Sequence, residues 1–171
     1  LPLFDVGTGG ASDAALTAMR KRGPLFLRVN PAKATVAEAL AQLTRDGVTA
    51  EAPTIVEGAL RVTANPRRVQ MSEAYLTGMV EVQDASSQAA VAMIPLTPGQ
   101  SVLDYCAGGG GKSLALAARG ADVTAHDIAP RRMADIPARA ARAGVRIRIK
   151  ETYQELGRNY DVVFCDAPCS G

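Results

Sequence analysis

The chain reads Val102-Leu103-Asp104-Tyr105-Cys106-Ala107-Gly108-Gly109-Gly110-Gly111-Lys112-Ser113 near its middle, where four consecutive glycines separate an apolar stretch from one that favours helix. Such glycines let the backbone approach a ligand closely, and the amides at the helix start offer donors to an anionic or carboxylate-bearing group. A merely tight turn, the alternative, needs only one glycine. The pattern therefore predicts a cofactor-binding loop, with candidate contacts at Cys106, Ala107, Gly108, Gly109, Gly110, Gly111 and Lys112.

Apolar strands alternate with helices around this loop. We expect strands at 101–104, 122–126, 145–149 and 161–165, and helices at 112–119 and 130–143. Pro137 lies inside the second helix and should kink or interrupt it, because proline removes a backbone donor there. This alternation is typical of an α/β fold with a parallel, doubly wound sheet.

A smaller α+β module is expected ahead of this sheet, over residues 1–70, with the sheet domain over 71–171. Its predicted elements are a helix over 13–19 capped by Ser12, a strand over 25–29, a helix through Leu43 opened by the capping box Thr35-x-x-Glu38, and a strand over 59–63. At the start of the second region we expect a short helix capped by Ser72, a strand over 80–83 and a helix over 85–94.

Composition excludes several functional classes. The chain has 171 residues, 47% of them hydrophobic, which indicates a folded protein. Three cysteines without a CxxC pair and a single histidine, His126, argue against a disulfide framework, a zinc site and a histidine-based triad. No apolar run approaches the roughly 20 residues that a membrane helix needs. We therefore expect a soluble, cytoplasmic protein without a metal or a membrane partner.

Positive charge gathers in residues 131–150, although the net charge of the chain is only +2. The basic residues there are Arg131, Arg132, Arg139, Arg142, Arg146, Arg148 and Lys150, against the single acid Asp135. Such a segment can attract a phosphate backbone, and it can equally be a solvated helix face.

The identity of the cofactor depends on two further positions. Gly111-Lys112-Ser113 resembles the end of a phosphate-binding loop, which leaves an NTPase as an alternative, but that motif requires glycine where this chain has Cys106. Adenosyl and dinucleotide cofactors instead need an acid at the tip of the second strand to accept hydrogen bonds from ribose. Asp127 stands there, and its alternative role is to cap the helix ahead of Pro130.

Several motifs together resemble the Nop/Sun family of RNA (cytosine-5) methyltransferases. Leu27-Arg28-Val29-Asn30 with Lys33 resembles R-V-N-x-x-K, and Gln83-Asp84-Ala85-Ser86-Ser87 resembles Q-D-x-x-S. The stretch 104–113 resembles D-x-C-A-A-P-G-G-K-T, with Gly108 and Gly109 replacing Ala-Pro, and Asp166-Ala167-Pro168-Cys169-Ser170-Gly171 matches D-A-P-C-S-G. Within the family, the resemblance is closest to bacterial enzymes acting on small-subunit ribosomal RNA.

The resemblance implies a Rossmann-like S-adenosylmethionine-dependent methyltransferase sheet, continuing beyond Gly171, behind a small RNA-recognition-like module. S-adenosyl-L-methionine would bind over residues 106–112 beside Asp166, with ribose on Asp127 and adenine near Glu151. RNA, in particular ribosomal RNA, would be the partner. Asp166 would balance charge at the N3/N4 edge of cytosine, with Lys112 as a second polar contact.

The cysteines have separate expected roles. In this family the motif's Cys169 helps to release product, and the attacking thiol belongs to a second motif, which would lie beyond Gly171. Cys165 is expected to be a packed core thiol, and Tyr105 and Cys106 have packing as an alternative role. These 171 residues alone are therefore expected to bind without turnover, and a noncatalytic RNA-binding fragment remains the alternative to an enzyme.

Overall fold

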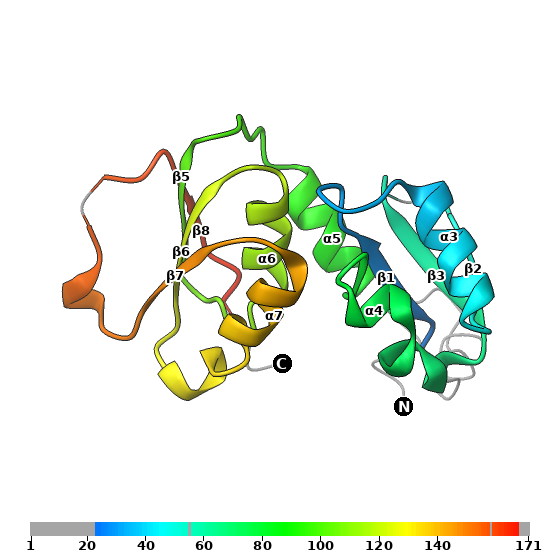
Figure 1. The fold of residues 1–171 in the computed structure, drawn as a ribbon. Helices are drawn as coiled ribbons and strands as arrows, with labels where there is room; N and C mark the ends of the chain where they lie inside the picture. Colours follow the sequence, from blue (N-terminus) through cyan, green and yellow to red (C-terminus); the bar gives the residue numbers. More distant parts are fainter. Residues whose placement is uncertain (1–22, 55, 158, 168–171) are drawn as a thin grey trace, which may run out of the picture.

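The computed structural model describes residues 23–54, 56–157 and 159–167, which form two units lying side by side (Figure 1). Each unit is built on its own four-stranded sheet. The helix expected over 13–19 and the predicted site residue Cys169 lie outside the described residues. The expected sheets, one small and one parallel, are both present.

The first unit is an antiparallel sheet with strand order β2-β3-β1-β4. Its strands are β1 (Leu25–Val29), β2 (Thr49–Glu51), β3 (Ala59–Ala64) and β4 (Val80–Val82). The helices α3 (Val36–Arg45) and α4 (Glu73–Leu76), with the 3-10 turn η1 (Pro66–Met71), complete the unit. Leu27, Leu43 and Leu60 are fully buried in its core.

The capping box predicted for α3 is confirmed. Thr35 Oγ1 accepts from the backbone N–H of Glu38 at 3.3 Å, and Glu38 Oε2 accepts from that of Thr35 at 2.8 Å. Two backbone donors at the helix start are thereby satisfied, which defines where α3 begins. The helix runs two residues past the expected end, to Arg45.

Strand β4 belongs to the first sheet although it follows residue 70 in the chain. Val80 and Val82 stand opposite Val29 and Leu27 of β1 in antiparallel register. The boundary at residue 70 stays a prediction, but the sheet itself continues to Val82. Helix α5 (Ala85–Ala92) begins only three positions later and packs against both β1 and the second unit.

The second unit is a parallel sheet with strand order β7-β6-β5-β8. The strands are β5 (Ser101–Asp104), β6 (Asp122–His126), β7 (Ile147–Lys150) and β8 (Val162–Phe164). Helix α6 (Gly111–Ala118) follows β5, the 3-10 turn η2 (Pro130–Met133) and helix α7 (Ile136–Ala143) follow β6, and the 3-10 turn η3 (Tyr153–Glu155) precedes β8. The expected α/β architecture is confirmed.

Two boundaries differ from expectation for identifiable reasons. The helix expected over 130–143 is interrupted, as Pro137 predicts, and proline stands in the first turn of α7. Strand β7 begins at Ile147 and not at Val145, because Gly144 adopts φ +72° and the Val145 N–H caps the preceding helix at Ala140 O (3.0 Å). The chain therefore needs two more residues before it can pair with β6.

Among the described residues, helices cover one face of this parallel sheet, the face turned toward the first unit (Figure 1). Val102 and Val123 point into that layer and are buried against α6. Val163 of β8 alternates to the opposite face and is 61% exposed. In the described part of the chain, no helix is long and apolar enough to cross a membrane.

Candidate cofactor loop and its surroundings

The glycine-rich loop joins β5 to α6 at the carboxyl end of the sheet, where ligands of open α/β sheets bind. Ala107 N–H donates to His126 O (2.9 Å), which ties the loop to the tip of β6. Gly110 has φ +82°, and a Cβ there would lie 2.6 Å from Ile136 Cγ1. Both the backbone conformation and the packing against α7 therefore require glycine at position 110.

A buried carboxylate lies at the base of the loop. Asp104 is 1% exposed; its Oδ2 accepts from Ser113 Oγ at 2.6 Å, while its Oδ1 has no hydrogen-bond partner among the described residues. Burial raises the pKa of this carboxyl. An unpaired buried acceptor beside amide donors suits a ligand carrying an ammonium group. Asp104 was not among the predicted site residues, although its position at the strand end before the glycines could have indicated it.

Asp127 stands directly against the loop. One of its oxygens accepts from Gly108 N–H and the other from Ala129 N–H, both at 2.9 Å, and Arg132 Nη1 lies 3.2 Å away. The side chain is 1% exposed. Asp127 therefore fixes the loop and the turn after β6, and its contact with a ribose stays a prediction.

Lys112 and Asp166 meet at the carboxyl end of the sheet. Lys112 Nζ, from the first turn of α6, lies 2.6 Å from Asp166 Oδ2, just past the end of β8. Their side chains are 24% and 52% exposed, so the pair is open to a ligand. The two candidates for polar contact with a base, 54 positions apart in sequence, are thus brought together.

The cysteines at this end depart from one expectation. Cys106 Sγ and Cys165 Sγ lie 3.9 Å apart. Cys165 is exposed, so its assignment to the core is wrong: it alternates with Phe164 onto the sheet face that no described helix covers. Burial, followed by the proximity of Cys165, raises the pKa of the Cys106 thiol. Tyr105 is 40% exposed, with its ring 5.1 Å from that of His126.

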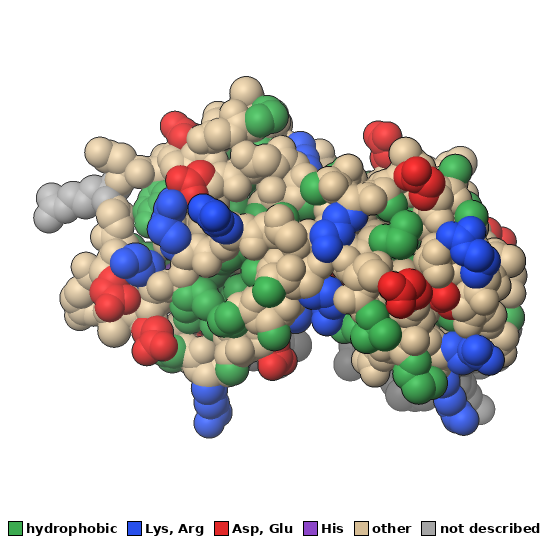
Figure 2. All heavy atoms as spheres, in the orientation of Figure 1, with side chains coloured by type: hydrophobic (Ala, Val, Ile, Leu, Met, Phe, Trp, Pro, Cys, Tyr) green, Lys and Arg blue, Asp and Glu red, His purple; other side chains and the backbone are tan. Residues whose placement is uncertain are grey.

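Two other groups of predicted residues have different surroundings. Glu151, just beyond β7, is exposed, and its contact with an adenine stays a prediction. Arg139 and Arg142, from the basic segment, are paired with Glu81 of β4 and are not a free basic surface. On the face shown in Figure 2, Lys and Arg side chains are scattered among acidic ones over both units. Among the described residues, no group of three His, Cys, Asp or Glu side chains is placed to hold a metal.

A parallel sheet with a glycine-rich loop after its first strand and an acid at the tip of the next strand defines the Rossmann-like class of cofactor-binding domains. Comparison with known families narrows this class. Residues 9–70 match the ferredoxin-like domain of RsmF/B-like methyltransferases, and residues 91–171 match the 16S rRNA methyltransferase RsmB/F family. The chain belongs to the RsmB/F methyltransferase family, which confirms the resemblance found in the sequence.

Individual relatives agree with this assignment. The chain is 32% identical to Ribosomal RNA small subunit methyltransferase B of Xanthomonas campestris over 173 aligned positions, covering 95% of this chain and 39% of the relative. It is 34% identical to the protein of that name from Yersinia pseudotuberculosis, covering 91% and 38%. The chain thus spans about two fifths of the length of these curated relatives.

Solved structures support the fold. The methyltransferase homolog protein from Pyrococcus horikoshii superimposes with a TM-score of 0.83 at 26% sequence identity, over 96% of this chain and 56% of that one. The superposition extends through both units, so the predicted combination of a Rossmann-like sheet with a small preceding module is confirmed. These comparisons favour a methyltransferase over the NTPase alternative.

Proposed function

We propose that this chain carries the cofactor-binding part of an S-adenosylmethionine-dependent RNA (cytosine-5) methyltransferase that acts on ribosomal RNA. The observation that carries the proposal is the Lys112–Asp166 pair beside the glycine-rich loop, 2.6 Å between charged atoms. The RsmB/F family, whose relatives include methyltransferases named for small-subunit ribosomal RNA, supports the substrate class.

The residues around the loop fit S-adenosyl-L-methionine. The unpaired Oδ1 of Asp104 suits the ammonium of its methionine part, and the amides at the start of α6 suit its carboxylate. Asp127 would take the ribose and Glu151 the adenine. Residues 106–112 would contact the cofactor between them, with Asp166 beside the loop.

The proposed chemistry explains why a carboxylate and an ammonium are needed together. S-adenosylmethionine, when bound, supplies a methyl group on a sulfonium. Cytosine C5 becomes nucleophilic only after a thiolate adds at C6, which shifts negative charge toward N3. Asp166, held by Lys112, would move a proton at the N3/N4 edge to balance that charge. Cys169 would assist the final step, in which the C5 proton leaves and the attacking thiolate is expelled.

Calorimetric titration with S-adenosylhomocysteine tests the cofactor. We expect binding, and a loss of about 1 to 3 kcal/mol in Asp127→Ala, because a buried partner is left unpaired. Asp122→Ala is the matched control: among the described residues that carboxylate makes only an exposed ion pair, with Arg148, and its loss should leave affinity unchanged. Mg²⁺-dependent ATP binding without binding of the adenosyl ligand would overturn the proposal in favour of the NTPase.

RNA carrying 5-fluorocytosine tests whether the protein is an enzyme or a noncatalytic RNA-binding protein. The C5 fluorine cannot leave as a proton does, so an enzyme is trapped as the covalent C6 adduct. The protein extended by the second cysteine motif should form the adduct, and these 171 residues should not. With ordinary cytosine, Cys169→Ala in the longer protein should accumulate covalent RNA on a denaturing gel, and Asp166→Ala should abolish the adduct. If Cys169→Ala prevents trapping, Cys169 is itself the nucleophile.

A further inference from the structure

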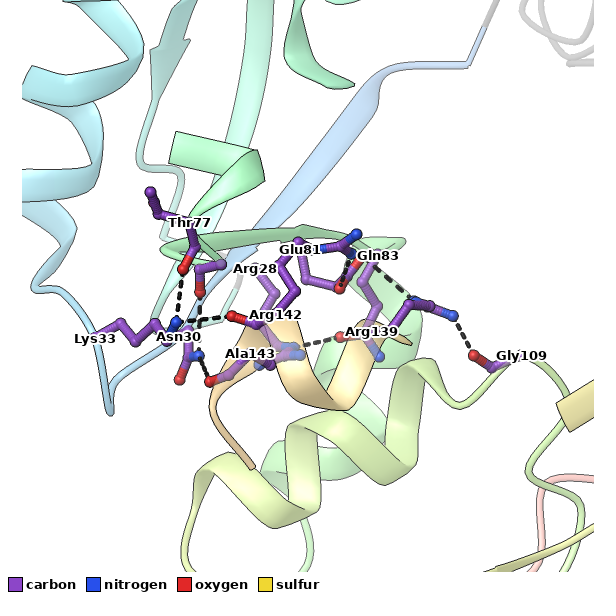
Figure 3. Close-up of polar contacts among 11 residues, drawn as sticks. Arg28, Asn30, Lys33, Thr77, Glu81, Gln83, Gly109, Arg139, Arg142 and Ala143 are labelled. Carbon is purple, nitrogen blue, oxygen red and sulfur yellow. Dashed lines mark hydrogen bonds and ion pairs between the residues drawn. The ribbon is translucent and has the colours of Figure 1, made fainter. Parts of the chain in front are cut away.

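One acidic side chain at the junction of the two units holds two arginines of α7 (Figure 3). Glu81, on edge strand β4, has a side chain only 7% exposed. Its Oε2 lies 2.7 Å from Arg142 Nη2, and its Oε1 lies 3.4 Å from Arg139 Nη2. Because a buried carboxylate is costly without partners, this pairing sets where α7 lies against the first sheet.

The other end of the Arg139 guanidinium faces the cofactor loop. Arg139 Nη1 donates to the carbonyl oxygen of Gly109, as Figure 3 shows. A single planar side chain therefore connects β4 of the first unit with the glycine-rich loop of the second. Arginine suits this position because its donors point in fixed, separate directions, whereas a lysine ammonium is a single point charge.

Gly109 is held less firmly than its neighbours: the N–H groups of Gly108 and Gly110 donate to Asp127 and to Ala107 O, whereas the Gly109 N–H has no hydrogen bond among the described residues. Residues 108–111 are all glycine, the residue type that loses most conformational freedom when it is ordered. Gly109 has no side chain to pack, and Arg139 Nη1 lies 3.2 Å from the position that a Cβ would take. The guanidinium thus occupies the space beside Gly109 as well as binding its carbonyl.

We propose that Arg139 is a positioning residue: by bridging Glu81 and the Gly109 carbonyl, it makes the docking of the first unit set the geometry of the cofactor loop and its affinity for S-adenosylmethionine. The effect on affinity rests on the function proposed above. The effect on the loop does not, because it concerns contacts within the chain alone.

The rest of the junction keeps α7 in place for this role. Asn30 Nδ2 donates to Ala143 O at 2.8 Å, and Lys33 Nζ donates to Arg142 O at 2.7 Å. Two side chains of the first unit therefore bind the carbonyl groups at the end of α7. At Gly78, a Cβ would lie 2.1 Å from Arg142 O. This close approach leaves α7 little room to move against the first sheet.

Hydrogen exchange of the ligand-free chain tests the positioning directly. The N–H groups of Ala107, Gly108 and Gly110 are all bonded within the loop region and report on its opening. In Arg139→Ala we expect their exchange to accelerate at least about fivefold, with a roughly five- to tenfold rise in the Kd of S-adenosylhomocysteine, which is within the range of one ordinary hydrogen bond. Arg131→Ala, which removes an exposed arginine of η2, is the control and should change neither.

Arg139→Lys distinguishes the loss of the bridge from a general loss of stability. It keeps a positive charge opposite Glu81, so the junction should persist with an unchanged melting temperature, but one ammonium cannot bridge both partners, so the loop amides should still exchange faster. Unchanged loop exchange in both Arg139 variants would overturn the proposal. If wild-type protein does not bind S-adenosylhomocysteine, the proposed function fails and loop exchange alone decides the role of Arg139.

A second substitution provides a rescue that a purely structural role would not predict. Gly109→Ala in the wild-type background places a methyl group 3.2 Å from Arg139 Nη1 and should weaken ligand binding. In the Arg139→Ala background that space is free, and alanine restricts the unbound loop. There we expect Gly109→Ala to slow loop exchange and to recover part of the affinity. The same sign of effect in both backgrounds would contradict the bridge.

Discussion

Replacing Asn30 with alanine is expected to lower the free energy of unfolding by about 2 to 4 kcal/mol. Asn30 is 2% exposed, and its Nδ2 donates to Gly78 O (3.1 Å) in the first unit and to Ala143 O (2.8 Å) at the end of α7. Alanine would leave both buried carbonyls unpaired, at roughly 1 to 3 kcal/mol each before relaxation. The loss should fall on the junction between the units.

Urea unfolding followed by circular dichroism measures this change, since a shift of the midpoint at constant slope reports stability. Asn30→Asp is the sharper variant: it keeps the shape but turns a carboxylate oxygen toward the two carbonyls, so it should destabilise at least as much as alanine. Asn159→Ala, at an exposed position, should stay within about 0.5 kcal/mol of wild type. A milder effect of aspartate than of alanine would refute the hydrogen-bond account.

Three further outcomes are expected. Burial raises the pKa of Asp104 above 3.8, so the contribution of this carboxyl to stability is present below pH 3.8 and is lost as the pH rises through the raised pKa. The stability of Asp104→Asn relative to wild type, measured by urea titration, should therefore increase between pH 3.5 and 7. A difference in stability that stays constant over this range would contradict this expectation. The rate at which iodoacetamide alkylates Cys106, followed by mass spectrometry, should still increase at pH values above the usual pKa of a thiol, because the pKa of Cys106 is raised. A rate that no longer increases above pH 8.5 would contradict this prediction. Gly110→Ala should lower the melting temperature by several degrees, because φ +82° and the 2.6 Å approach to Ile136 both exclude a methyl group; an unchanged value would mean that the loop relaxes freely.

Local signals predicted much of the fold. The capping box at Thr35 and Glu38, the glycine run at 108–111 and Pro137 each act within a few residues of themselves, so their consequences could be read from spacing alone. The Lys112–Asp166 pair was also foreseeable, because the carboxyl ends of parallel strands meet at one edge of a sheet.

Long-range pairing was the part that sequence could not supply. Residues 131–150 predicted a basic surface, but Arg139 and Arg142 are held by Glu81, 58 and 61 positions away, and nothing local marks that acid as their partner. Cys165 was assigned to the core because its strand is apolar, whereas burial depends on what covers each face. Asp127 was expected to face a ribose. In the structure it accepts a hydrogen bond from Gly108 N–H, and this bond could not be predicted from the sequence because it depends on the path of the loop backbone.

Strand β4 completes the first sheet from beyond residue 70, and this affects how the two units can be separated. A fragment cut at that residue would leave Phe26 O and the Asn30 N–H, which bond Gln83 and Met79, on an open strand edge, and such an edge recruits strands from other molecules and favours aggregation. Only Gln83 and Asp84 separate β4 from α5; the first donates its N–H to Phe26 O and the second caps α5. Because both residues of that connection are hydrogen-bonded, we expect a protease to cleave it slowly and the two units to tumble in solution as one body.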